Sequence, residues 1–196
     1  STHGYDVVDP RVINPELGGE EQFTALVDVV RRHDLRVLQD IVPNHMACDA
    51  GNTMLMDIFE KGPTSRYYHF FDIDWDHPYE NMKGRVLVPI LGKFYAECLE
   101  EGELRLSYGE NGFTINYYNF SFPLKIESYV QIVDHNSAAL EERFSKNNPV
   151  FLNYIGVVHI LKALGAEREN GERDERIRHA KGMLWELYTE SSDIKT

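Results

Sequence analysis

Apolar and polar residues alternate with two different periods near the start of the chain, and each period predicts an element. Residues 19–33 carry apolar side chains at helical spacing, with acidic residues in the first turn and basic residues in the last. The apolar positions are Phe23, Leu26, Val27 and Val30. Residues 35–42 (LRVLQDIV) are apolar and β-branched, which predicts a buried strand. A helix followed directly by such a strand is half of a βαβ unit, which predicts a parallel sheet covered by helices.

The middle of the chain has less regular patterns that predict an α+β arrangement. Short helices are expected over residues 52–62 and 93–102, and a short strand over residues 85–91 (RVLVPIL). The clearest local signal is residues 103–118 (ELRLSYGENGFTINYY), where apolar residues alternate on both sides of a GENG turn. That pattern predicts a β-hairpin.

The last third of the chain predicts helices over residues 128–144, 149–165 and 175–188. Pro149 and a charged stretch that contains Gly171 separate them. The chain opens on a loop rich in Gly, Asp and Pro, as if between elements already under way. We therefore expect a fragment of a larger protein.

Composition narrows the possible partners and locations. The 196 residues include 20 Lys and Arg against 32 Asp and Glu, a net charge of −12, which argues against a nucleic-acid partner. No apolar run approaches the roughly 20 residues that span a bilayer, so no membrane partner is expected. The first ten residues lack the features of a signal peptide, and Cys48 and Cys98 do not make a disulfide framework. A reducing, cytoplasmic location is therefore expected.

The segment DIVPNH, residues 40–45, places polar groups at the end of the predicted strand. Asp40 lies within the apolar run, and Asn44 and His45 follow its break at Pro43. Parallel strands present functional side chains at their carboxyl ends, because the loops that follow open there. These three polar residues are therefore a candidate site. On spacing alone, the alternative is that Asp40 and Asn44 bond loop amides in Asx turns, which are common at strand ends.

A second candidate precedes the predicted helix. Gly4 allows a sharp turn before Tyr5, which would present an aromatic face at the rim of a cleft. Sugars have apolar C–H faces and polar edges, so a tyrosine ring beside histidine and carboxylate groups suits them. The alternative is a ring packed under its own loop.

Other patterns carry less specific chemistry. Residues 72–76 (DIDWD) match the first ligand offsets of an EF-hand loop, but His77 and Lys83 stand where that loop requires Gly and Glu. A solvated acidic loop is the better interpretation, and no zinc-binding spacing occurs elsewhere. The aromatic residues within 67–79 and 117–122 either line a sugar cleft or form the core of a small subdomain.

Taken together, these segments resemble the α-amylase family, glycoside hydrolase family 13. HGYDVVDP, NPELGGEEQF and LRVLQDIVPNH are similar to the second βα unit and third strand of that family's barrel, and DIVPNH is similar to its D-x-x-x-N-H region. Longer strings, among them SRYYHFFDIDWD and INYYNFSFPL, resemble the members that form maltooligosyltrehalose. The resemblance covers residues 1 to about 125 and weakens in the helical tail.

The resemblance implies a fold class between α/β and α+β. Residues 1–45 would be a fragment of a TIM (β/α)8 barrel, with one barrel strand and its helix. Residues 46–127 would be an inserted α+β subdomain with the β-hairpin, and residues 128–196 a helical segment.

The resemblance also implies an activity for the parent protein. It would act on a maltooligosaccharide or α-1,4-glucan, with no cofactor and no metal, and would convert the reducing-end α-1,4 bond to an α,α-1,1 bond by intramolecular transglucosylation. The alternatives are another α-amylase-family hydrolase or glucanotransferase, or a non-catalytic carbohydrate-binding relic.

Individual residues receive roles from the same resemblance. Tyr5 and His45 would contact the sugar in subsite −1, Asp40 would brace an arginine beside the nucleophile, and Asn44 would support the loop. The family's catalytic carboxylates lie in later conserved regions, and no G-x-R-x-D pattern follows residue 45. The chain is therefore expected to lack catalytic residues and to be inactive alone.

The predicted strand also has consequences for assembly. Residues 35–42 expect partners on both edges, and the barrel neighbours that would supply them are missing from the sequence. An exposed apolar edge strand templates pairing with another chain. We therefore expect the chain either to self-associate through this segment or to pair it with residues 85–91.

Overall fold

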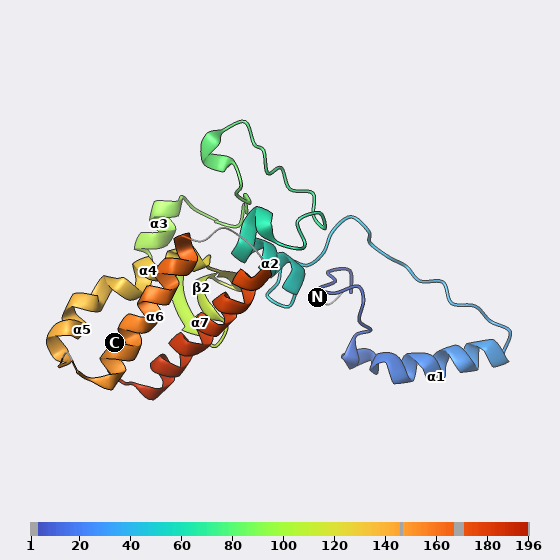
Figure 1. Cartoon of the computed structure of the whole chain (residues 1–196). Coiled ribbons are helices and arrows are strands. Elements are labelled where there is room, and N and C mark those ends of the chain that lie inside the picture. The colour runs from blue at the N-terminus through green and yellow to red at the C-terminus, as the bar shows by residue number, and fades with distance from the viewer. Residues whose placement is uncertain (1–3, 146, 167–170, 196) are drawn as a thin grey trace. The chain divides into compact units, whose positions relative to one another are not determined.

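The computed structural model describes residues 4–145, 147–166 and 171–195, in two units, residues 1–55 and 56–196 (Figure 1). The first unit contains helix α1 (Gly19–Arg32), preceded by a 3-10 turn, η1 (Pro15–Leu17). Gly18 joins them with a φ of 99°, a left-handed backbone that glycine adopts without steric cost. The helix predicted over residues 19–33 is confirmed, although none of its residues is buried.

The strand predicted over residues 35–42 is not formed. The segment has no regular secondary structure, and its apolar side chains face solvent, with Leu38 98% exposed and Ile41 68% exposed. A strand exists only where a neighbour completes its ladder of backbone hydrogen bonds, and no described residue pairs with this segment. The prediction was therefore wrong for this chain.

The boundary between the two units falls within helix α2 (Thr53–Lys61). Asn52 precedes α2, and its Oδ1 accepts a hydrogen bond from the backbone N–H of Leu55 at 3.1 Å, as an N-cap does. Its side-chain amide donates to the carbonyl of Ala47 at 2.9 Å, and the whole residue is buried. The short helix predicted to stop at Gly62 is confirmed, and a 3-10 turn, η2 (Gly62–Thr64), follows it.

The predicted hairpin is present in the second unit and extends into a three-stranded antiparallel sheet. Strands β1 (Leu104–Gly109) and β2 (Gly112–Tyr117) pair in the register Leu106↔Ile115. Strand β3 (Phe120–Pro123) pairs with β2 and was not predicted. The sheet order is β1-β2-β3.

Residues 85–91 were also predicted to be a strand and are irregular instead. The N–H of Ile90 donates to the carbonyl of Val88 at 3.0 Å, which folds the backbone around Pro89. Proline has no N–H for a strand ladder. Neither this segment nor residues 35–42 forms a strand, so the expected pairing between them is wrong for the described residues.

The second unit also contains further helices, some of which pack against the sheet (Figure 1). They are α3 (Tyr95–Glu100), α4 (Ile126–Val133), α5 (Ser137–Arg143), α6 (Pro149–Ala166) and α7 (Gly171–Glu190), with 3-10 turns η3 (Glu80–Met82) and η4 (Asp134–Asn136). The helix predicted over residues 128–144 is therefore two helices with a 3-10 turn between them. The helices predicted over residues 93–102, 149–165 and 175–188 are confirmed.

One hydrophobic core holds the second unit together. It draws residues from β2, α4, α6 and α7: Phe113, Ile126, Tyr129, Phe151, Tyr154, Val157, Val158, Leu161, Leu164, Ile177, Ala180, Leu184 and Leu187. The N–H of Phe113 donates to the buried hydroxyl of Tyr129 at 3.0 Å, which ties β2 to α4.

The division of the chain into three parts, 1–45, 46–127 and 128–196, stays a prediction.

Among the described residues, α6 is the one helix long and apolar enough to cross a membrane, with a mean hydropathy of 1.4 over 18 residues. The expectation that no such segment exists was therefore too strict. Six of its residues belong to the buried core, and it packs against α4 and α7. Core packing accounts for its apolar composition.

Candidate functional site

The four residues singled out in the sequence, Tyr5, Asp40, Asn44 and His45, lie in the first unit, and one contact among them joins residues far apart in the chain. The hydroxyl of Tyr5 donates to Oδ2 of Asp40 at 2.9 Å, between residues 35 positions apart. Gly4 adopts a φ of 76° immediately before Tyr5, as the predicted sharp turn requires. The ring of Tyr5 is 44% exposed, so it is not packed under its own loop.

His45 lies between two oxygen atoms. Its Nδ1 is 3.2 Å from Oδ1 of Asn44, and its Nε2 is 3.4 Å from Oδ1 of Asp6. The side chain of His45 remains 46% exposed. The structure thus connects Asn44 with His45 and Tyr5 with Asp40, and a backbone hydrogen bond from Ala47 to Val7 at 2.9 Å joins the two loops that carry them.

Asp6 belongs to this cluster and was missed in the sequence. Its carboxylate faces a histidine that lies 39 positions away, and only the folded loops reveal that contact. The signal that was available is its place beside Tyr5, since neighbouring residues in a tight turn share one site. Asp40 accepts its described hydrogen bond from Tyr5, whereas the resemblance gave it an arginine.

An ion pair stabilises the turn that follows. The guanidinium of Arg11 donates to both carboxylate oxygens of Asp9, at 2.8 and 2.7 Å, and the Arg11 N–H donates to the same carboxylate at 3.0 Å. These hydrogen bonds lower the pKa of Asp9 to about 2, because they favour the ionised carboxylate. No group of three or more His, Cys, Asp or Glu side chains within the described ranges is arranged to hold a metal ion.

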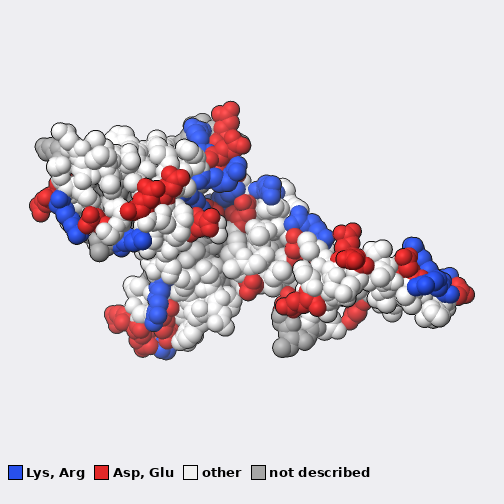
Figure 2. All heavy atoms as spheres, turned by 90° about the horizontal axis from the view of Figure 1, so that it is seen from below, with Lys and Arg blue, Asp and Glu red and all other residues white. Residues whose placement is uncertain are grey.

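The molecular surface carries both signs of charge. On the face shown in Figure 2, Lys and Arg side chains lie beside Asp and Glu side chains.

Cys48 is exposed and Cys98 is buried, and both are free thiols.

Comparison with known proteins shows which family the part of the chain around this cluster resembles. Residues 1–96 match the model of the alpha-amylase catalytic domain. Residues 1–96 are alpha-amylase-like. The alpha-amylase-like part of the chain includes all of the cluster, as well as α1, α2 and residues 66–79.

Individual relatives narrow the similarity. A maltooligosyl trehalose synthase homologue of Mycobacterium tuberculosis is 40% identical over 94 residues, which are 47% of this chain and 12% of that protein. A solved structure described as DSM5389 glycosyltrehalose synthase is 36% identical with a TM-score of 0.56, over 68% of this chain and 17% of that one. A hypothetical maltooligosyl trehalose synthase of Sulfolobus tokodaii is 36% identical with a TM-score of 0.53, over 72% of this chain and 18% of that one. The chain thus spans less than a fifth of the length of these relatives.

Proposed function

We propose that this chain is a segment of an enzyme that converts the reducing-end α-1,4 bond of a maltooligosaccharide to an α,α-1,1 bond. The observation that carries the proposal is the Tyr5–Asp40 and His45–Asp6 cluster, which lies within the residues 1–96 that match the alpha-amylase catalytic domain. The identity of 40% over 94 residues to a maltooligosyl trehalose synthase homologue supports the choice of reaction. In the parent, residues 35–42 would be a barrel strand paired on both sides, with α1 packed on it.

The cluster would contact one glucosyl unit, the one whose anomeric carbon forms the bond that is broken. The exposed face of the Tyr5 ring would pack against the apolar C–H face of a glucosyl unit, and Nε2 of His45 would bond one of its hydroxyls. The hydrogen bond from Tyr5 to Asp40 fixes the orientation of the phenol, and Asn44 Oδ1 fixes that of the imidazole. These four side chains bind and orient. The carboxylates that attack the anomeric carbon and protonate the leaving oxygen would come from other parts of the parent.

In the parent, an enclosed active site would favour transfer over hydrolysis. Isomerisation requires the released glucose to stay beside the glycosyl-enzyme until its anomeric hydroxyl attacks, so water must be excluded. We further propose that the parent works in the cytoplasm, and that the isolated chain self-associates through the exposed segment 35–42.

A chimeric enzyme tests the residue roles. The aligned segment of the Sulfolobus tokodaii relative is replaced by this chain, and turnover of maltopentaose is measured. We expect His45→Ala to lower kcat/KM by about 10- to 100-fold, because a hydrogen bond to the substrate is lost. Tyr5→Ala should lower it by at least about 10-fold, because the ring and its bond to Asp40 both disappear.

Matched controls separate site effects from folding effects. His33→Ala and Tyr95→Ala remove exposed side chains of the same types outside the cluster, and they should leave kcat/KM within about twofold. If His45→Ala and His33→Ala behaved alike, with equal melting temperatures, His45 would have no substrate contact.

A further inference from the structure

Residues 66–79, here called the aromatic loop, carry aromatic rings that are exposed and do not belong to the buried core. Phe70 is 63% exposed and Tyr79 is 69% exposed. Phe71 and Trp75 are half-buried, so the segment packs in part against other residues without forming a buried core of its own. Large exposed rings are a frequent mark of a binding surface rather than of packing.

Ring contacts within the aromatic loop hold it in shape. Tyr68 stacks on Trp75 with centroids 5.5 Å apart and planes 16° apart, and Tyr67 meets Phe70 edge-on at 5.3 Å. The N–H of Gly84 donates to the carbonyl of Trp75 at 2.9 Å, which closes the end of the loop. These ring contacts and this hydrogen bond therefore hold the exposed rings on a segment of defined shape.

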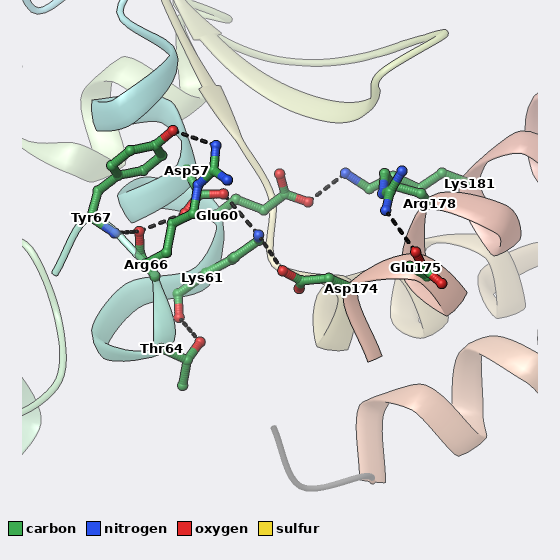
Figure 3. Close-up of polar contacts among 11 residues, drawn as sticks. Asp57, Glu60, Lys61, Thr64, Arg66, Tyr67, Asp174, Glu175, Arg178 and Lys181 are labelled. Carbon is green, nitrogen blue, oxygen red and sulfur yellow. Dashed lines mark hydrogen bonds and ion pairs between the residues drawn. The ribbon is translucent and has the colours of Figure 1, made fainter. Parts of the chain in front are cut away.

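Polar contacts anchor the base of the aromatic loop to two helices of the same unit (Figure 3). The buried Ser65 accepts a hydrogen bond from the N–H of Tyr67 at 3.1 Å and donates to Asp57 of α2 at 2.5 Å. Lys61 of α2 lies 2.8 Å from Asp57 and 2.8 Å from Asp174 of α7. Because α7 is part of the buried core, the loop base is tied to the most stable part of the unit.

Carboxylates complete the surface of the aromatic loop. From Phe71 to Pro78 half-buried and exposed residues alternate, as they do along an extended segment, and Asp72, Asp74 and Asp76 are exposed together with Pro78. Carboxylate oxygens accept hydrogen bonds from hydroxyl groups, and a carboxylate can bind two neighbouring donors at once. Aromatic faces together with such acceptors match the two kinds of surface on a sugar ring.

We propose that the aromatic loop is a binding surface for an α-1,4-linked glucan chain, made of residues other than those of the Tyr5 and His45 cluster. The inference rests on the proposed function for its choice of ligand, since the Mycobacterium tuberculosis relative is named for a maltooligosyl compound. Phe70 and Tyr79 stack on glucosyl units, and the aspartates accept hydrogen bonds from their hydroxyls.

Fluorescence of the 196-residue chain tests this surface directly. Trp75 and Trp185 are its two tryptophans, so a Trp185→Phe background leaves Trp75 as the reporter within the loop. The indole N–H of Trp75 is shielded and has no acceptor among the described residues, which makes its emission sensitive to a change in the loop. Maltoheptaose should produce a saturable change, and cellopentaose, a β-1,4 glucan, should produce none.

Variants identify the rings that bind. Phe70→Ala and Tyr79→Ala should each weaken maltoheptaose binding about 3- to 10-fold, the loss expected for one aromatic stacking contact. Phe94→Ala removes a ring that is 81% exposed outside the loop, and it should bind like the parent chain. An equal response to cellopentaose, or unchanged binding by both loop variants, would overturn the assignment.

The outcomes separate this inference from the proposed function. If the chain binds maltoheptaose through Phe70 and Tyr79 but the chimeric enzyme forms no α,α-1,1 product, the glucan surface stands and the proposed reaction fails. If the chimera is active while Phe70→Ala and Tyr79→Ala bind maltoheptaose normally, the reaction stands and the aromatic loop has another role.

Discussion

At the residue scale, the candidate site is defined by two carboxylates, Asp40 and Asp6, that contact the hydroxyl of Tyr5 and the imidazole of His45. The sequence predicted that Gly4 allows a turn, and that turn is present. It left open whether the Tyr5 ring is exposed or packed under its own loop, and the ring is exposed. The bond from Tyr5 to Asp40 and the approach of Asp6 to His45 could not be predicted, because each joins residues more than 30 positions apart through loops. Loop-to-loop distances depend on the tertiary fold and leave no periodic signal in a sequence.

The ion pair beside the site gives a pH prediction. The pKa of Asp9 is about 2, below its ordinary value of 3.8, so the Asp9–Arg11 pair stabilises the turn above pH 3.8 and this contribution is lost as the pH falls toward 2. Carbon-13 NMR of the Asp9 carboxyl should show a midpoint near 2. In Arg11→Ala the midpoint should rise toward 3.8, and a midpoint unchanged by that substitution would show that the pair is not formed.

At the element scale, the sequence predicted best those elements whose backbone groups find their hydrogen-bond partners within the same short segment. The helices α1, α2, α6 and α7 and the β1–β2 hairpin satisfy their backbone groups within a short stretch of chain. The strands predicted over residues 35–42 and 85–91 failed because a single strand has no partner of its own, and no described segment supplies one. Strand β3 was missed because it has only four residues after the turn that contains Tyr118.

The hairpin offers a matched pair of glycines for a stability test. Gly112 has a φ of 107°, and a Cβ added there would lie 1.9 Å from the hydroxyl oxygen of Tyr129. Gly112→Ala should therefore lower the free energy of unfolding by about 3 kcal/mol or more, through backbone strain and loss of the buried bond to Phe113. Gly109 pairs with Gly112 across the turn, and a Cβ there meets nothing within 4 Å.

Urea denaturation measures both substitutions. Gly109→Ala should change the free energy of unfolding by less than about 0.5 kcal/mol, since it buries nothing and adds no strain. Equal destabilisation by the two variants would contradict the packing of Tyr129 against the turn.

At the scale of the whole molecule, the two units differ in how they are stabilised. Residues 56–196 share a buried core, whereas α1 in the first unit buries none of its residues. Exposed apolar residues are dense there, including Leu17, Leu26, Leu35 and Leu38. A segment without a core is not expected to be stable by itself, so it requires another surface to cover it.

Hydrogen exchange tests that requirement. The amides of residues 36–46 have no backbone acceptor among the described residues, so they should exchange rapidly in dilute solution. Their protection should rise with protein concentration as copies pair through residues 35–42, while the β1–β2 amides keep constant protection. Rapid exchange at every concentration, with a constant monomer mass by light scattering, would contradict self-association.

The count of reducing ends tests the central claim most directly. Hydrolysis of maltopentaose creates one new reducing end for each bond broken, whereas conversion of the terminal α-1,4 bond to α,α-1,1 removes the one that was present. In the chimeric enzyme that carries this chain, the reducing-end concentration should fall as maltopentaose is consumed, with no free glucose beyond a minor fraction. A rise in reducing ends would identify a hydrolase segment instead, and unchanged maltopentaose in a folded chimera would contradict the account.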